Sequence, residues 1–282
     1  MSVELDVYRP RMMSVAYRML GSVTDAEDAV QDAFLRLHAT PEVTSPEGFL
    51  VTATTRRCID HLRANRRRRT YIGPWVPEPI DTKAGASITV LSESLTQAFL
   101  LMLERLSPTE RAAFLLRTVF EYEFAEIAGI LGKSEANVRQ IVSRAKSRLD
   151  EDKQRFRPAP EDAERLAEQF LNACRSGDVQ QIEQLFTEEP EVHSDGGGKV
   201  PAARVIIRGR QRAAKFLAGV FCKKHREREM RLATVNGEPG VVFLSGEHVV
   251  QVASLRIENG VRAVYMTNNP DKLSRWSVAK ID

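Results

Sequence analysis

The sequence of 282 residues has only three cysteines, Cys58, Cys174 and Cys222, which lie far apart and form no C-x-x-C pair. This scarcity argues against a disulfide framework and a zinc site, so no metal is expected, and it fits a reducing compartment. No apolar run approaches the roughly 20 residues that cross a bilayer. The first residues also lack the cationic-then-apolar order of a signal peptide. We therefore expect a cytoplasmic protein with no membrane partner.

An excess of charge of one sign is also lacking, because the formal net charge is only +3. This value does not by itself predict a nucleic-acid partner. The distribution of charge is more informative, since four consecutive arginines stand at 66–69.

Proline and glycine are scarce in residues 1–69, which read as helices, and are concentrated in residues 70–90. The segment 70–90 is therefore predicted to be a linker that cannot form a continuous helix. Residues 91–156 are again helical, and a second break precedes a C-terminal domain at 161–282. That domain is predicted to be α+β, with helices against one curved antiparallel sheet. Its expected helices are 161–176, 178–186 and 209–224, and its β-rich runs are 230–235, 240–246, 247–257 and 261–267.

A helix-turn-helix pattern covers residues 124–149. Gly132 stands at the turn, where a left-handed backbone costs least, and Ser134 is placed to cap the second helix. Upstream, Ser107 is placed to cap a further helix. The buried face of the second helix is predicted from helical spacing: Val138, Ile141, Val142, Ala145 and Leu149. Its other face carries side chains suited to bases and phosphates in a major groove: Glu135, Asn137, Arg139, Gln140 and Arg144. The alternative is an αα-hairpin with a solvated polar face.

The first helical block contains an acidic helix and a basic helix. Thr24 and Glu27 predict a capping box at the start of the acidic helix. Its polar face carries Asp25, Asp28, Gln31 and Asp32, which either stabilise the helix dipole or form a docking face for a basic partner. The basic helix at 48–69 is expected to bury Phe49, Ala53, Ile59 and Leu62. It directs Arg56, Arg57, His61 and Arg63 outward, as expected of a surface that follows a phosphate backbone.

These motifs together resemble a known family. T-D-A-E-D-A-V-Q-D-A-F-L-R-L resembles region 2.2 of bacterial sigma factors, and the basic helix resembles regions 2.3–2.4. The segment from L-S-P-T-E-R through the helix-turn-helix resembles region 4. Residues 1–150 are therefore similar to an extracytoplasmic-function (ECF) sigma factor, with two all-α domains, a region 2 bundle and a region 4 helix-turn-helix.

The resemblance implies partners for each face. Asp25, Asp28, Gln31 and Asp32 would dock on the β′ clamp helices of core RNA polymerase, whose β flap is a further expected contact. Arg56, Arg57, His61 and Arg63 would engage the promoter −10 element, and Glu135, Asn137, Arg139, Gln140 and Arg144 the −35 element. No catalytic residue and no cofactor are expected, because the polymerase carries out the chemistry.

The C-terminal domain resembles the SnoaL-like branch of the NTF2-like fold. Three peptides resemble the signatures of the ECF group that carries this domain as a fused regulator: Trp75-Val-Pro-Glu-Pro79, Asp195-Gly-Gly-Gly-Lys199 and Asn269-Pro-Asp-Lys-Leu273. The resemblance implies interdomain regulation without a separate anti-sigma protein. Its expected contact residues are Trp75, Pro77, Glu78, Pro79, Asp195, Gly196, Gly197, Lys199, Asn269, Pro270, Asp271 and Lys272. Trp75 is expected to be the apolar anchor of the linker.

Two alternatives remain at this point. The chain could be a ligand-gated regulator that binds DNA without polymerase, or an enzyme with a DNA-binding appendage. For an enzyme, His193 and Asp195 would form an acid–base pair in a cavity. A small-molecule ligand in the C-terminal domain is compatible with each interpretation, and the sequence does not give the sign of the regulation.

Overall fold

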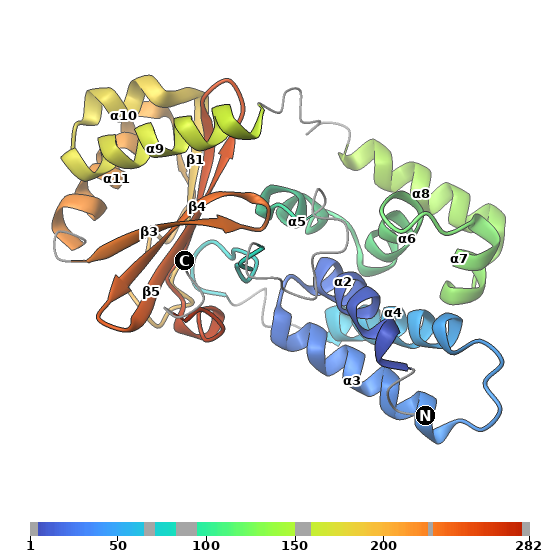
Figure 1. Ribbon diagram of the computed structural model, residues 1–282. Helices are drawn as coiled ribbons and strands as arrows, with labels where there is room; N and C mark the ends of the chain where they lie inside the picture. Colours follow the sequence, from blue (N-terminus) through green and yellow to red (C-terminus); the bar gives the residue numbers. More distant parts are fainter. Residues whose placement is uncertain (1–4, 65–70, 83–94, 150–158, 225–227, 278–282) are drawn as a thin grey trace. The chain divides into compact units, whose positions relative to one another are not determined.

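The computed structural model describes residues 5–64, 71–82, 95–149, 159–224 and 228–277 (Figure 1). The chain divides into two compact units. The first comprises Met1–Arg67 and Ser87–Lys153, and the second comprises Arg68–Ala86 and Gln154–Asp282. Most of the predicted linker thus belongs to the C-terminal unit. The arginine run at 66–69 lies outside the described residues.

The helical unit begins with a 3-10 helix, Asp6–Tyr8, which is followed by α2, α3 and α4. These helices span Arg9–Leu20, Val23–Ala39 and Pro46–Ala64, and they pack against one another. Among the described helices of both units, none combines the length and apolar character that a bilayer crossing requires.

Two local predictions in this bundle are wrong. The cap of α3 is Ser22, whose hydroxyl accepts a hydrogen bond from Asp25 N, and Thr24 lies inside the helix. The reason is Gly21, whose left-handed φ of 65° ends α2 and leaves Ser22 as the first extended residue. The buried face of α4 is also displaced, since Phe49, Ala53 and Leu62 are only partly buried. Because α4 packs on both α2 and α3, its buried face is wide and polar in part: Leu50, Val51, Thr54, Thr55, Cys58 and Ile59.

The second half of the helical unit contains α5, α6, α7 and α8, which span Gln97–Leu103, Pro108–Thr118, Phe124–Leu131 and Glu135–Leu149. Three predictions are confirmed here. Ser107 caps α6 in a reciprocal capping box with Glu110, Gly132 adopts a left-handed φ of 62°, and Ser134 Oγ accepts a hydrogen bond from Asn137 N. The five residues predicted for the buried face of α8 are all buried.

The two halves of the helical unit pack together through α2, α4, α6 and α7. Arg111 is 3% exposed and joins them, since its guanidinium donates to the carbonyl of Met19 at 2.8 Å and to Glu104 at 2.8 Å. A buried cation that is hydrogen-bonded to both halves favours one defined packing arrangement.

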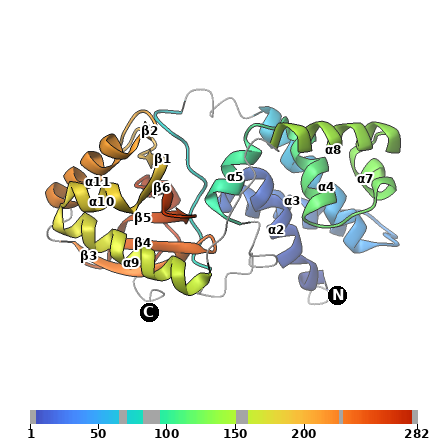
Figure 2. The same ribbon diagram turned by 90° about the horizontal axis from the view of Figure 1, so that it is seen from above.

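In the described part of the C-terminal unit, three α-helices lie on one face of a six-stranded sheet (Figures 1 and 2): α9 (Pro160–Ser176), α10 (Val179–Leu185) and α11 (Arg210–Lys224). The strands are β1 (Phe186–Asp195), β2 (Ile207–Arg208), β3 (Glu229–Val235), β4 (Glu238–Ser245), β5 (His248–Ile257) and β6 (Val261–Thr267). Their order is β2-β1-β6-β5-β4-β3. The predicted α+β architecture is therefore confirmed, as are the four β-rich runs.

The sheet differs from the prediction in one respect, because it is mixed and not wholly antiparallel. β1 pairs with β6 in parallel, with Val192 opposite Val264 and Asp195 opposite Thr267. No tight turn joins these two strands, so nothing local forces them to run in opposite directions. β1 also has no counterpart among the predicted runs, since its Thr-Glu-Glu-Pro start hides the strand pattern.

Alternating side chains of the sheet supply two separate apolar clusters. One lies against the helices and includes Phe170, Phe221, Phe243 and Leu255. The other contains Val235, Val242, Leu244, Val252, Leu273 and Trp276. Leu273 and Trp276 follow a short 3-10 helix, Pro270–Lys272, after the last strand. The C-terminal segment thus folds back onto the sheet.

Candidate functional site

The acidic face of α3 is open to solvent at its centre and paired at its edges. Asp28 and Gln31 are exposed. Asp32 lies 2.9 Å from Arg57 and Asp25 lies 3.6 Å from His61, with 38–41% of each carboxylate side chain exposed. The structure therefore brings two residues predicted to contact polymerase next to two residues predicted to contact DNA. Exposed pairs of this kind contribute about 0–1 kcal/mol, so they can exchange partners at little cost.

The two other predicted DNA-contact residues of α4 reach the second half of the helical unit. The Arg56 guanidinium donates to the carbonyls of Ile130 at 2.8 Å and Gly129 at 3.1 Å. These carbonyls lie at the C-terminal end of α7, where a cation is favoured by the helix dipole. Arg63 donates to Thr109 Oγ1 at 3.2 Å. In this arrangement, Arg56 is bonded to α7 and Arg63 to α6.

The predicted −35 face of α8 is exposed along its whole length. Glu135, Asn137, Arg139, Gln140 and Arg144 are all exposed. Arg139 bonds to Glu135 one turn earlier, and its guanidinium lies 4.2 Å from the centre of the Phe124 ring. A solvated row of donors on a helix held by a buried opposite face has the form required for entry into a major groove.

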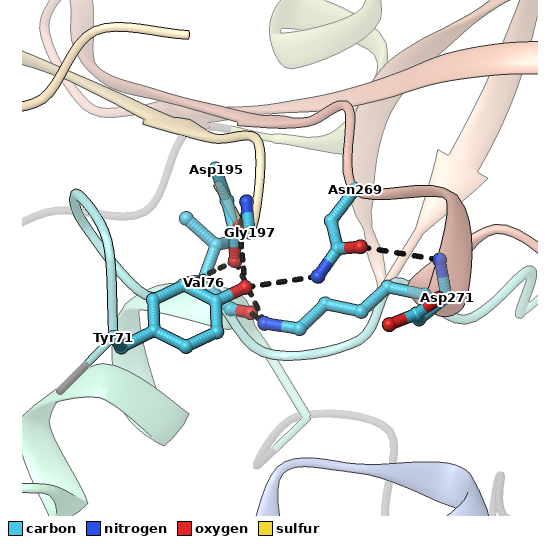
Figure 3. Close-up of polar contacts among 7 residues, drawn as sticks. Tyr71, Val76, Asp195, Gly197, Asn269 and Asp271 are labelled. Carbon is cyan, nitrogen blue, oxygen red and sulfur yellow. Dashed lines mark hydrogen bonds and ion pairs between the residues drawn. The ribbon is translucent and has the colours of Figure 1, made fainter. Parts of the chain in front are cut away.

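In the C-terminal unit, the linker binds to a fully buried carboxylate (Figure 3). Asp195 is 0% exposed. Its Oδ1 accepts hydrogen bonds from the Tyr71 hydroxyl at 2.6 Å and from Gly197 N at 3.0 Å. Its Oδ2 accepts from Val76 N at 2.9 Å and from Lys272 Nζ at 2.7 Å. Both oxygens thus have two donors each, which satisfies a buried carboxylate.

Lys272 completes this arrangement from the other side. Its Nζ also donates to the carbonyl of Val76 and lies 4.5 Å from the centre of the Trp75 ring and 5.1 Å from that of Tyr71. The Asp195–Lys272 pair therefore holds the N–H and the carbonyl of one linker residue. Burial, followed by the hydrogen bond to Asp195 and the charge of that carboxylate, raises the pKa of the Tyr71 hydroxyl.

Further along, the linker is held by an indole and an amide. Trp276 Nε1 donates to the carbonyl of Pro79 at 2.9 Å. Ile80 N donates to Asn236 Oδ1 at 3.0 Å, and Asn236 N donates back to the Ile80 carbonyl at 2.9 Å. We call Tyr71–Thr82 together with Asp195, Asn236, Lys272 and Trp276 the linker clasp.

The glycine-rich loop allows the clasp to close tightly. Gly197 has φ of +59°, and a Cβ there would lie 2.4 Å from Asn269 Nδ2. Gly198 has φ of +73°, and a Cβ there would lie 2.7 Å from Ile72 Cδ1. Both a left-handed backbone and close approach are therefore required, which only glycine supplies without strain.

Not every residue of the three peptides touches the linker. Lys199 and Asp271 are exposed and bind each other at 2.6 Å. Asn269 does reach the linker, since its Nδ2 donates to the Tyr71 hydroxyl at 3.0 Å. The expected anchor, Trp75, is only partly buried, whereas Val76 is 0% exposed. Pro77, Glu78 and Pro79 are buried, Pro270 is exposed, and Gly196 packs against the carbonyl of Val200.

Sequence reasoning missed several clasp residues, among them Tyr71, Val76, Ile80, Asn236 and Trp276. Asn236 precedes Gly237 at the turn between β3 and β4, and it has a positive φ of 54°. Its amide oxygen, however, binds a chain segment far away in sequence. Only the tertiary fold brings such partners together.

The suggested acid–base pair of His193 and Asp195 is wrong. His193 Nε2 lies 3.0 Å from Glu191 Oε2, and its ring centre is 5.0 Å from that of Tyr265. The hydrogen bond from His193, with further donation and charge from Arg208, outweighs burial and lowers the pKa of Glu191 to about 2. Asp195 is committed to the clasp, so the two side chains serve different networks.

Comparisons with known proteins match the two halves of the helical unit in chain order. The family model described as Sigma-70 region 2 matches residues 5–68, and that described as Sigma-70, region 4 matches residues 96–149. The ECF RNA polymerase sigma factor SigJ of Mycobacterium tuberculosis is 33% identical over 288 residues, covering 96% of this chain and 92% of SigJ. The probable ECF RNA polymerase sigma factor SigI of the same species is 27% identical over 275 residues, covering 94% of this chain and 92% of SigI.

The likeness extends through the C-terminal unit. The crystal structure of Mycobacterium tuberculosis SigJ matches this chain with a TM-score of 0.76 at 31% identity, covering 96% of this chain and 98% of that one. Two sigma-70 regions in order, and a relative similar along nearly its whole length, carry the same conclusion. This chain belongs to the ECF RNA polymerase sigma factors, which recognise promoters and initiate transcription.

Proposed function

We propose that the fused C-terminal unit regulates this sigma factor by holding the linker between regions 2 and 4. The observation that carries the proposal is the buried Asp195–Lys272 pair, which binds both backbone groups of Val76. Region 2 is described as far as Ala64 and region 4 from Leu95, so the clasp acts on the only covalent connection between them.

Each polar face has a proposed partner. The α3 face with Asp25, Asp28, Gln31 and Asp32 docks on the β′ clamp helices of core polymerase, while region 4 contacts the β flap. Arg56, Arg57, His61 and Arg63 engage the −10 element. The exposed face of α8 reads the −35 element, because its donors and acceptors are solvated and mounted on a rigid helix.

The contacts of Arg56 support a closed, inactive state of the helical unit. The −10 and −35 elements lie about 25 base pairs apart, or roughly 85 Å at about 3.4 Å per base pair. Arg56 is 2.8 Å from the Ile130 carbonyl. Arg144 follows Ile130 across one tight turn and part of one helix, which together span at most about 30 Å. Regions 2 and 4 must therefore separate before both elements are bound at once.

The proposed mechanism is a two-state equilibrium. In the closed state the clasp holds the linker and regions 2 and 4 stay packed, whereas core polymerase and promoter DNA favour the open state. The free-energy shift of this equilibrium cannot exceed the difference between the binding free energies of polymerase and DNA for the open and the closed state. We propose that the protein acts in the cytoplasm, needs no separate anti-sigma protein and catalyses no reaction of its own.

Run-off transcription with core polymerase tests this proposal. The proteins compared are the full chain, an Asp195→Ala variant, a chain ending near Arg157 and a chain ending before Asn269. Exposed Asp271→Ala is the matched control. We expect more promoter-specific transcript from the three altered proteins than from the full chain and the control. Less transcript from all three would mean that the C-terminal unit assists initiation and would overturn the inhibitory sign.

Binding to core polymerase is measured alongside. We expect Asp28→Lys to weaken binding and an exposed change on the unrelated α10, Gln181→Leu, to leave it unchanged. Equal binding by both would remove α3 as the docking face.

A further inference from the structure

The C-terminal unit contains a cavity of about 950 Å³ near the end of the sheet where β1 and β6 finish. Its walls include Phe216 and Val220 of α11, Gln251 of β5, Met266 of β6, Asn268 and Trp276. A volume of this size is in the range of cavities that enclose small organic ligands. None of these residues belongs to the promoter or polymerase faces described above.

Two residues of the cavity wall each carry a polar atom that has no hydrogen-bond partner within the described parts of the chain. Gln251 is 3% exposed, and its Nε2 has no hydrogen-bond acceptor among the residues that the structure describes. Asn268 Oδ1 likewise has no donor within the described parts of the chain. A buried amide without a partner is unfavourable, and most such groups in proteins are satisfied. Here the residues that carry one unused donor and one unused acceptor both line the same cavity.

The rest of the wall limits the chemistry of an occupant. The buried lining residues are apolar, amide or, at Ser194, hydroxyl. The ionisable lining residues are Glu247 and His248, which are exposed, and Arg228, which is partly buried and already interacts with another group. A cation would meet no buried carboxylate among these lining residues, and an anion would have to compete with the interaction that Arg228 already makes. A neutral, mainly apolar molecule fits best, with an acceptor such as a carbonyl and a hydroxyl or N–H donor.

We propose that this cavity is a binding site for a neutral, mainly apolar small molecule that accepts a hydrogen bond from Gln251 Nε2 and donates one to Asn268 Oδ1. The site shares a wall with the linker clasp, since the indole of Trp276 lines the cavity while its Nε1 donates to the Pro79 carbonyl. Pro270 and Leu273, beside Lys272, line it as well. An occupant packs against Trp276 and strengthens its hold on the linker. This consequence rests on the proposed function, whereas the binding site does not.

Photolabelling of the full chain with 4-hydroxybenzophenone tests the site, because this probe has two apolar rings, a carbonyl and a hydroxyl. We expect adducts on peptides that contain Val220 or Met266. Gln251→Leu, of similar volume, should lower their yield about fivefold, as loss of one hydrogen bond implies. Gln181→Leu, an exposed amide on α10, should leave the yield unchanged. Val220→Trp, which fills the cavity, should abolish labelling while circular dichroism confirms the fold.

Adducts only at other peptides, or a yield at the cavity that neither Gln251→Leu nor Val220→Trp lowers, would overturn the site. Coupling to the clasp is read separately, as slower amide hydrogen exchange at Val76 and Ile80 with the probe bound. Unchanged exchange would remove the coupling. If labelling behaves as expected but Asp195→Ala does not alter transcription, the binding site stands and the proposed regulation fails.

Discussion

Two ion pairs with similar distances occupy opposite environments in this protein. Asp195 and Lys272 are 2.7 Å apart, with 0% and 11% of their side chains exposed. Asp32 and Arg57 are 2.9 Å apart, with 41% and 40% exposed. The first pair has lost its water and depends on its partners, whereas the second remains solvated. The same chemistry therefore serves to fix the linker in one unit and to present an exchangeable surface in the other.

The largest expected effect is on the buried pair. Asp195→Ala leaves the Lys272 ammonium buried without a carboxylate, and we expect a loss of about 3–5 kcal/mol in the unfolding free energy. The linker amide of Val76 should also lose its protection from hydrogen exchange. The control is Asp271→Ala in the exposed pair with Lys199, for which about 0–1 kcal/mol is expected. Urea denaturation measures both, and equal effects would remove the distinction drawn between buried and exposed pairs.

The glycine loop sharpens the same comparison. Gly197 and Gly246 both have φ of +59°, but a Cβ at Gly197 would collide with Asn269, whereas one at Gly246 meets no atom within 4 Å. Alanine at either site carries a similar backbone penalty. We expect Gly197→Ala to cost about 1–3 kcal/mol more than Gly246→Ala, because only the former overpacks the clasp. Thermal unfolding of the two variants gives the difference, and no difference would argue against close packing there.

On the exposed face of α8, a substitution should change transcription and leave the unfolding free energy nearly unchanged. Arg144→Ala on α8 is expected to alter the unfolding free energy by less than about 0.5 kcal/mol. Transcription from a −35-dependent promoter should fall about 5- to 150-fold, since one base contact carries about 1–3 kcal/mol. Lys146→Ala, also exposed on α8, is the control for loss of charge alone. A stability loss from Arg144→Ala that accounts for the lost transcript would contradict the assignment.

The smallest effect concerns pH. The pKa of Tyr71 is raised in the folded clasp, so the folded state keeps this proton longer than the unfolded state, in which the pKa is about 10. The stabilisation is complete below about pH 10 and is lost as the pH rises above that value. In a titration followed by tyrosinate absorbance, Tyr71→Phe should remove one late-ionising group. Removal of a group that ionises near pH 10 would contradict the buried hydrogen bond.

The fold was predictable from the sequence where local signals are strong. The α8 pattern of Val138, Ile141 and Val142 and the left-handed turn at Gly132 are confirmed. The cap of α3 was misplaced because two candidate residues, Ser22 and Thr24, stand close together, and only the geometry after Gly21 distinguishes them.

The clasp was only partly predictable, for a physical reason. The three peptides drew attention to Asp195 and Lys272, whose side chains carry charge. Tyr71 and Trp276 offered no comparable signal, since their roles come from one hydroxyl and one N–H brought across the fold. The size of Trp75 predicted that it would be the buried anchor of the linker, whereas the smaller Val76 occupies the buried position.

The chain has two tryptophans, and the clasp contains both. Trp75 lies with its ring 4.5 Å from the Lys272 ammonium, and Trp276 is bonded to the Pro79 carbonyl. Sigma regions 2 and 4 contain no indole. Ultraviolet excitation at the long-wavelength edge of the absorption band, where only tryptophan absorbs, therefore yields fluorescence from the clasp alone. Release of the linker would expose both rings to water and shift this emission to longer wavelength, so opening of the isolated protein can be followed in real time.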